Sequence, residues 1–177
     1  MIDFSRNYFE LFGLPQRFRF DATRLDSAYH ALQNEVHPDR HADGGDAQRR
    51  VALQSSAHVN AAYGALKDPV ARANYLLGLH GIDALAETDT ALPLEFLERQ
   101  LERREEAEEA VDASDDDALR RILDGVRAEA RALEDDLADR LDDKRDYESA
   151  RTVVRELKFL AKLTDDLAAL EARFDDL

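Results

Sequence analysis

The side chains that could do chemistry gather in one short stretch, residues 36–46, with the sequence VHPDRHADGGD. Pro38 disfavours the α conformation for the residue before it, so a helix that enters this stretch should end at His37. The two glycines near its end provide a flexible turn. We therefore expect His37, Pro38 and Asp39 to be exposed at the tip of a helical hairpin, a place that favours a functional contact.

The same stretch offers a second chemistry, because His37, Asp39 and His41 are spaced as a His-x-Asp-x-His run that could hold zinc. Pro38 and the helix end splay these side chains, and the sequence offers no further ligand nearby. We therefore predict no metal and no cofactor. No nucleophile–base pair or phosphate-cradling glycine loop is evident, so no catalytic residue is predicted. A metal-binding hydrolase that uses the histidine-rich first half stays a remote alternative.

Helical patterns on both sides of the loop must position it. A helix capped by Asp21 should carry an apolar face up to the loop, and a helix capped by Asp46 should carry another away from it. Such faces bury a common core when the two helices pack antiparallel. Shorter helices are expected over residues 4–12, ended by a glycine and a proline, and over 69–78. The two stripes are Leu25, Tyr29, Leu32 and Val36, and Ala52, Ser55, Val59, Ala62, Tyr63 and Leu66.

The second half predicts three more helices: a heavily charged one over 93–111, one that starts at 114–117, and a last one whose stripe runs from Ala150 to Phe174. Helices of this kind with short loops pack as an antiparallel bundle. Since no stretch is typical of a strand, the predicted fold class is all-α. The predicted organisation is an N-terminal hairpin domain over 1–80, a linker over 81–92 and a three-helix bundle over 93–177.

Charge separates the two halves. Residues 1–80 hold nine Lys and Arg against nine Asp and Glu, whereas residues 81–177 hold fifteen against thirty and carry the whole net charge of −15. An acidic half repels phosphate backbones, so nucleic acid is not an expected ligand. There is no cysteine, which excludes disulfides and fits a cytoplasmic protein. No segment is apolar enough to span a membrane, and no signal pattern opens the chain.

The tripeptide His37-Pro38-Asp39 is the signature of the J-domain, the module by which DnaJ-type co-chaperones activate a DnaK-type ATPase. Residues 8–15 (YFELFGLP) resemble the J-domain opening, and residues 59–69 (VNAAYGALKDP) resemble its third helix and exit. The resemblance implies that His37, Pro38, Asp39 and Arg40 contact the ATPase chaperone. Such a contact favours the hydrolysis-competent conformer of the chaperone and involves no catalysis by the J-protein itself.

The second predicted helix differs from the J-domain pattern in its charge. J-domains usually carry several Lys and Arg on this helix, which steer it toward an acidic ATPase surface. Here Arg24 and His30 stand against Asp26 and Glu35, and Asn34 occupies a position where a basic residue is common. We therefore expect weak electrostatic steering and a specialised ATPase partner rather than a general one.

A narrower resemblance is to HscB, the J-type co-chaperone family of iron–sulfur cluster assembly. It rests on residues 8–15 and 75–81 (YLLGLHG) in the first half and on 96–105 (FLERQLERRE) and 154–163 (VRELKFLAKL) in the second. In that family an exposed apolar patch of the bundle, with acidic residues beside it, binds the cluster scaffold protein IscU. The scaffold-binding residues implied here are Leu97, Leu101, Glu102, Glu105 and Phe159.

The position of Phe159 on its helix indicates a surface role independently of the resemblance. At 100° per residue it lies well off the core stripe of the last helix, which uses Leu157 and Leu160. An aromatic residue outside the core stripe is either a rim contact or part of a binding patch. The alternative for Leu97 and Leu101 is that they only form the core seam of their helix.

The sequence thus predicts a non-enzymatic co-chaperone in the maturation of iron–sulfur proteins. Its expected partners are a dedicated DnaK-type chaperone (HscA-like), whose ATP hydrolysis the J-domain stimulates, and an IscU-like scaffold that the bundle delivers. Neither nucleic acid nor membrane is an expected partner. Eukaryotic members can carry a targeting segment and metal-binding cysteines in front, so a bacterial, cytoplasmic form is expected. The alternative is a J-domain co-chaperone for a different client.

Overall fold

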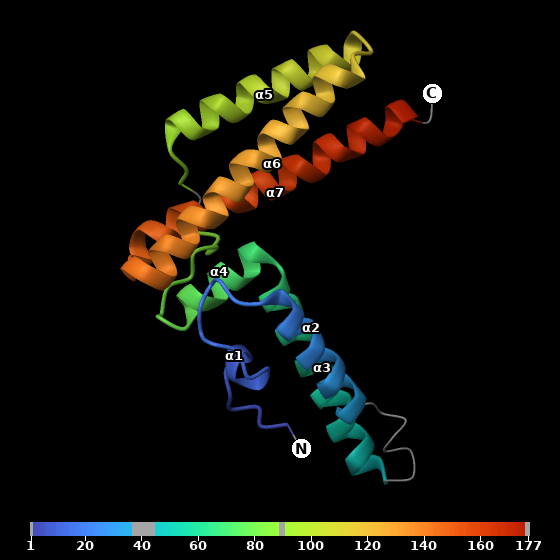
Figure 1. Cartoon of the computed structure of the whole chain (residues 1–177), viewed down its shortest axis with the longest axis vertical. Helices are drawn as coiled ribbons and strands as arrows, with labels where there is room; N and C mark the ends of the chain where they lie inside the picture. The colour runs from blue at the N-terminus through green and yellow to red at the C-terminus, as the bar shows by residue number, and fades with distance from the viewer. Residues whose placement is uncertain (1, 37–44, 89–90, 176–177) are drawn as a thin grey trace. The chain divides into compact units, whose positions relative to one another are not determined.

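The computed structural model describes residues 2–36, 45–88 and 91–175, with side chains described as far as residue 172. The described residues form helices and loops without a strand, which confirms the all-α prediction. The chain divides into two compact units, Met1–Leu76 and Leu77–Leu177. Figure 1 shows the helices of both units.

A helical hairpin forms the body of the first unit. Helices α2 (Ala22–Val36) and α3 (Asp46–Lys67) lie side by side and antiparallel (Figure 1). The predicted stripes face each other in its core, although Tyr29, Leu32 and Tyr63 are only half-buried. The buried members of the stripes are Leu25, Val36, Ala52, Ser55, Val59, Ala62 and Leu66.

A polar seam joins the same two helices. The rings of Tyr29 and Tyr63 stack with their centroids 4.0 Å apart. The Tyr63 hydroxyl donates a hydrogen bond of 2.8 Å to Oδ1 of Asp26, and the Lys67 ammonium lies 3.5 Å from the same oxygen. The Tyr63 hydrogen bond, more than the Lys67 charge, lowers the pKa of Asp26. The carboxylate on α2 is therefore paired with α3.

Two short helices pack with the hairpin. Helix α1 spans Tyr8–Leu11, and α4 spans Pro69–Gly78, the range that the sequence predicted. Tyr75 of α4 stacks on Tyr8 at 4.3 Å between centroids, and its hydroxyl accepts a hydrogen bond of 2.9 Å from the Tyr8 N–H. The Arg72 guanidinium lies over the Phe18 ring at 4.5 Å. These contacts hold the segment that precedes the hairpin against α4, which follows it.

Two helix starts differ from the prediction. Asn7 and Glu10 form a capping box, in which each side chain accepts a hydrogen bond from the backbone N–H of the other residue. Helix α1 therefore begins at Tyr8, and Phe4 lies outside it with 48% of its surface exposed. At the start of α3 the cap is Gly45, so Asp46 is the first helical residue and its carboxylate sits in the first turn.

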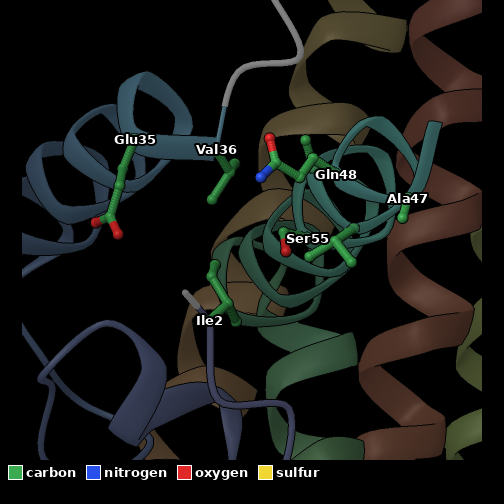
Figure 2. A pocket seen from close by; sticks show the side chains of 8 residues that line it. Ile2, Glu35, Val36, Ala47, Gln48 and Ser55 are labelled. Carbon is green, nitrogen blue, oxygen red and sulfur yellow. The ribbon is translucent and has the colours of Figure 1, made fainter. Parts of the chain in front are cut away.

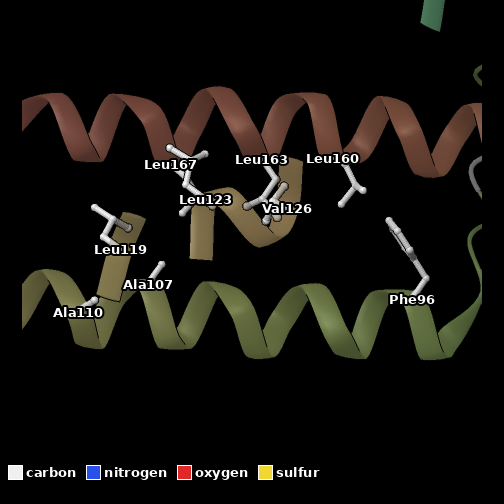
Figure 3. Close-up of a cluster of buried hydrophobic side chains, with 9 residues drawn as sticks. All are labelled: Phe96, Ala107, Ala110, Leu119, Leu123, Val126, Leu160, Leu163 and Leu167. Carbon is white, nitrogen blue, oxygen red and sulfur yellow. The ribbon is translucent and has the colours of Figure 1, made fainter. Parts of the chain in front are cut away.

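The second unit is a bundle of α5 (Leu94–Asp112), α6 (Asp116–Ala138) and α7 (Tyr147–Asp175). A π-helical segment, η2 (Asp139–Lys144), follows α6, and the left-handed Arg145 (φ 56°) follows it. Asp115 caps α6 by accepting a hydrogen bond of 2.9 Å from the Ala118 N–H. The bundle core in Figure 3 comprises Phe96, Ala107, Ala110, Leu119, Leu123, Val126, Leu160, Leu163 and Leu167.

Helix α5 is attached to this core by few large apolar side chains. It buries Phe96, whereas its other buried residues are two alanines and Gln100. Polar contacts add to the attachment, since Arg103 pairs with Glu129 of α6 and Arg99 lies 3.6 Å from the same carboxylate. The leucines Leu94, Leu97 and Leu101 of α5 remain exposed.

Replacing Leu123 with alanine should destabilise the bundle by about 2–5 kcal/mol, because its fully buried side chain would leave a cavity between the helices. Urea unfolding followed by circular dichroism measures this change. Leu101→Ala is the matched control, since Leu101 is 59% exposed and its truncation should change stability by less than about 0.5 kcal/mol. Equal losses in the two variants would contradict the described core.

The segment that precedes α5 is docked on α7 rather than free. Ala84 is fully buried, and the Arg155 guanidinium of α7 donates hydrogen bonds to the carbonyl oxygens of Ala84 (3.0 Å) and Ala91 (2.9 Å). Near the start of this segment His80 stacks on Tyr147 with ring centroids 3.9 Å apart. We call residues 80–88, 91 and 92 the strap.

Among the described residues, no helix has the length and apolar character to cross a membrane.

Candidate functional site

The expected ATPase-binding residues His37, Pro38, Asp39 and Arg40 lie outside the described residues, and so does His41. The structure describes the two helix ends that bracket them, at Val36 and at Gly45. In the sequence, the expected ATPase-binding residues thus connect α2 to α3. Within the described ranges, no group of three or more acidic or histidine side chains could hold a metal ion.

A hollow of about 450 Å³ lies at this end of the hairpin (Figure 2). Val36 of α2, Gln48 of α3 and Ile2 of the N-terminal segment line it. Val51 lines it as well and is 40% exposed. The hairpin end at which α2 ends and α3 begins is therefore partly apolar and hollowed.

The expected scaffold-binding residues lie at the surface of the bundle. Leu97 is 39%, Leu101 59% and Phe159 36% exposed, and Glu102 and Glu105 are exposed too. The core side of α5 is instead made by Phe96, Gln100, Ala107 and Ala110. The alternative in which Leu97 and Leu101 form the core seam of their helix does not fit these positions.

An ion pair places the two parts of this surface on the same side of the bundle. Arg104 follows Leu97 by seven residues and Leu101 by three, so the three share one face of α5. Asp166 follows Phe159 by seven residues and shares its face of α7. Since Nη2 of Arg104 lies 3.9 Å from Oδ2 of Asp166, these two faces adjoin. We call Leu97, Leu101, Glu102, Glu105 and Phe159 the apolar–acidic patch.

The buried Phe96 packs against the patch residue Phe159. Its ring, 2% exposed, meets the Phe159 ring edge to face with centroids 5.6 Å apart and an angle of 82° between the planes. The pair holds Phe159 in one orientation, which lowers the entropy lost when a partner covers it. The sequence pattern alone did not reveal this supporting role of Phe96.

A partly buried carboxylate lies among the charged groups that join the three helices. Burial raises the pKa of Glu156 above its ordinary value, the nearby Glu129 raises it further, and Arg99 acts in the opposite direction. The folded chain therefore binds this proton more tightly than the unfolded chain, and the stability that the site contributes falls as the pH rises above the ordinary pKa of a glutamate.

Replacing Glu156 with glutamine should accordingly stabilise the bundle at pH 7, by up to about 1 kcal/mol for a charge that remains partly solvated. At pH 4 and below, where the parent side chain is itself largely neutral, the difference should vanish. Urea unfolding of parent and variant at the two pH values measures it. A variant that is less stable than the parent at pH 7 would contradict this assignment.

A helical hairpin whose two helices are joined by a segment with the sequence His-Pro-Asp, followed by a helical bundle with an exposed apolar–acidic patch, defines a J-domain co-chaperone. Curated relatives agree with this class. The chain is 45% identical over 172 residues to a co-chaperone protein HscB homolog of Azoarcus sp. (strain BH72), with 97% of each chain covered. It is also 45% identical to the HscB homolog of Ralstonia nicotianae, covering 97% of this chain and 98% of that one. The chain belongs to the HscB co-chaperone family.

Solved structures and a family model support the same assignment. The chaperone HscB from Vibrio cholerae matches with a TM-score of 0.86 at 38% identity, over 96% of this chain and 99% of that chain. The human co-chaperone protein HscB matches with a TM-score of 0.87 at 28% identity, over 95% and 83%. The model described as the HSCB C-terminal oligomerisation domain matches residues 92–168. Both halves of the chain thus have counterparts in one family.

Proposed function

We propose that this chain presents an IscU-type cluster scaffold to a dedicated DnaK-type chaperone of the HscA kind and stimulates ATP hydrolysis by that chaperone. Membership of the HscB family supports a co-chaperone role in the maturation of iron–sulfur proteins. The observation that carries the scaffold part of the proposal is the exposed apolar–acidic patch, which the bundle supports but does not cover.

The first unit supplies the contact with the ATPase. Residues His37, Pro38, Asp39 and Arg40 bind the conformer of the chaperone that hydrolyses ATP, and this differential binding raises the population of that conformer. The J-domain contributes no catalytic group to the reaction. Because Asp26 is paired with Tyr63 and Lys67, its negative charge disturbs the approach of an acidic ATPase surface less than a free carboxylate would.

The second unit supplies the contact with the scaffold. Leu97, Leu101 and Phe159 give apolar surface that a partner can remove from water, and such burial contributes about 25 cal/mol per Å². Glu102 and Glu105 beside them favour a partner with basic side chains and fix its register. A chain that holds scaffold and chaperone at once turns their encounter into an intramolecular one and raises the effective concentration of scaffold at the chaperone.

Calorimetric titration of the purified IscU-type scaffold into the full chain tests the scaffold part. Saturable binding with one scaffold per chain supports the proposal, whereas the absence of heat and of co-elution in gel filtration overturns it and favours a different client. The stimulation of the chaperone is measured separately, because a J-domain can activate its ATPase without this client.

A further inference from the structure

A groove of about 390 Å³ lies next to the patch, between the strap and α7. Leu85 and Leu92 of the strap line one side, and Phe159 lines the other. Its volume is near the lower end of the roughly 300–1,000 Å³ of small binding pockets. Phe159 therefore belongs to two surfaces, since it also forms one end of the apolar–acidic patch.

The groove is a built feature and not a chance gap. The two hydrogen bonds from the Arg155 guanidinium to the carbonyl oxygens of Ala84 and Ala91 hold the strap at two points against α7. Ala84 is fully buried by this docking. The wall that carries Leu85 and Leu92 is thus fixed before any partner arrives.

The rim of the groove carries basic side chains, whereas the surrounding unit is acidic. Lys158 and Lys162 line it at i, i+4 spacing on α7, and both are exposed. Within the described part of the chain neither lysine takes part in an ion pair. Glu87 is the carboxylate on the strap side of the rim. Two lysines that form no ion pair with the described residues therefore line an apolar hollow in a half of the chain that carries a net charge of −15.

We infer that this groove is a second contact for the scaffold, and that it accepts an apolar side chain of the scaffold with a carboxylate beside it that pairs with Lys158 and Lys162. The inference rests on the proposed function, because it concerns the same partner. A protein that covers Phe159 reaches the groove as well, since the Phe159 ring is common to both surfaces.

The charges beside the patch and the groove also determine the orientation in which the partner docks. Carboxylates of Glu102 and Glu105 border the patch on the α5 side, and ammonium groups border the groove on the α7 side. A partner with basic groups toward α5 and acidic groups toward α7 makes favourable contacts at both ends, and the reversed partner meets like charges at both. The direction of docking is therefore set by the bundle surface.

The charge part is tested with the double variant Lys158→Glu, Lys162→Glu in the full chain, titrated with the IscU-type scaffold. We expect roughly tenfold to hundredfold weaker binding, because two attractive contacts become repulsive. Lys144→Glu is the matched control: it is an exposed lysine of the same unit outside the groove lining, and it should bind like the parent. An equal effect of the control and of the double variant overturns the inference.

The apolar part is tested with Ala86→Trp, which fills the groove from the half-buried Ala86 of the strap and leaves every charge in place. It should weaken scaffold binding, with the circular dichroism and thermal unfolding of the parent retained. Parent-like binding by this variant overturns the groove assignment. If the parent itself does not bind scaffold, the proposed function fails together with this inference; if the parent binds and the variants bind equally well, this inference alone fails.

A second copy of this chain is the rival occupant, because its acidic helices also complement two lysines. Sedimentation equilibrium of the parent and of the double lysine variant distinguishes the two occupants. Self-association that the double variant abolishes, combined with unchanged scaffold binding, assigns the groove to a second copy and overturns the inference. Equal association states with weaker scaffold binding support it.

Discussion

Replacing His37 with glutamine is expected to abolish the stimulation of ATP hydrolysis by the HscA-like chaperone, which should fall to its basal rate. The J-domain acts only through differential binding to one conformer of the ATPase, and coupling of this kind typically amounts to a factor of about 5–150. Loss of the contact that distinguishes the conformers removes the whole effect. Steady-state ATP hydrolysis with parent and variant, at a saturating concentration of each, measures it.

The control for this variant comes from the same loop. His41→Gln changes a histidine four residues away, outside the His-Pro-Asp tripeptide, and should leave stimulation intact. Both variants should bind scaffold like the parent, because the apolar–acidic patch lies in the second unit. Loss of stimulation in both, together with a stoichiometric metal by elemental analysis of the parent, would favour the His-x-Asp-x-His metal site instead.

The second large effect is expected at the patch. Leu101→Ala should weaken scaffold binding about tenfold or more, because a leucine that is 59% exposed in the free chain would be covered in the complex and contributes roughly 1.5–3 kcal/mol when fully buried. Phe159→Ala should weaken binding further, since a supported aromatic ring is the usual anchor of an interface. Calorimetric titration of scaffold into each variant gives the two dissociation constants.

Leu53→Ala is the matched control for these variants. Leu53 is an exposed leucine of α3 in the first unit, 63% exposed, and its truncation should not change scaffold affinity. A loss of affinity is easier to interpret for Leu101→Ala than for Phe159→Ala, because the Phe159 ring also packs on the buried Phe96. Scaffold binding that survives both Leu101→Ala and Phe159→Ala at parental strength would remove the patch from the proposal.

Much of the fold was predictable because local signals agree with one another. Pro69 and the break before it placed α4, and the apolar spacing placed the buried face of α3 from Ala52 to Leu66. The start of α1 was missed although its signal is local, since Asn7 and Glu10 have the spacing of a capping box. The π-helical segment Asp139–Lys144 has no comparable signature, because its geometry depends on how α6 and α7 pack around the turn.

Some features of the candidate site were likewise predictable from local sequence, and others were not. The exposure of Phe159 followed from its position off the core stripe, which is a property of one helix. The support from Phe96 and the groove beside Lys158 and Lys162 depend on contacts between segments far apart in the chain, such as the bonds from Arg155 to the strap. No spacing within one helix reveals such contacts, so sequence reasoning passed over them.

The measurement that tests the central proposal most directly is ATP hydrolysis by the HscA-like chaperone alone, with this chain, with the scaffold, and with both. The proposal predicts stimulation by this chain that is greatest when scaffold is present and that disappears with His37→Gln. Scaffold should add little in the presence of Leu101→Ala at concentrations where the parent is saturated. Stimulation by the parent that is indifferent to scaffold would contradict the assigned client, and no stimulation in any condition would contradict the assigned chaperone contact.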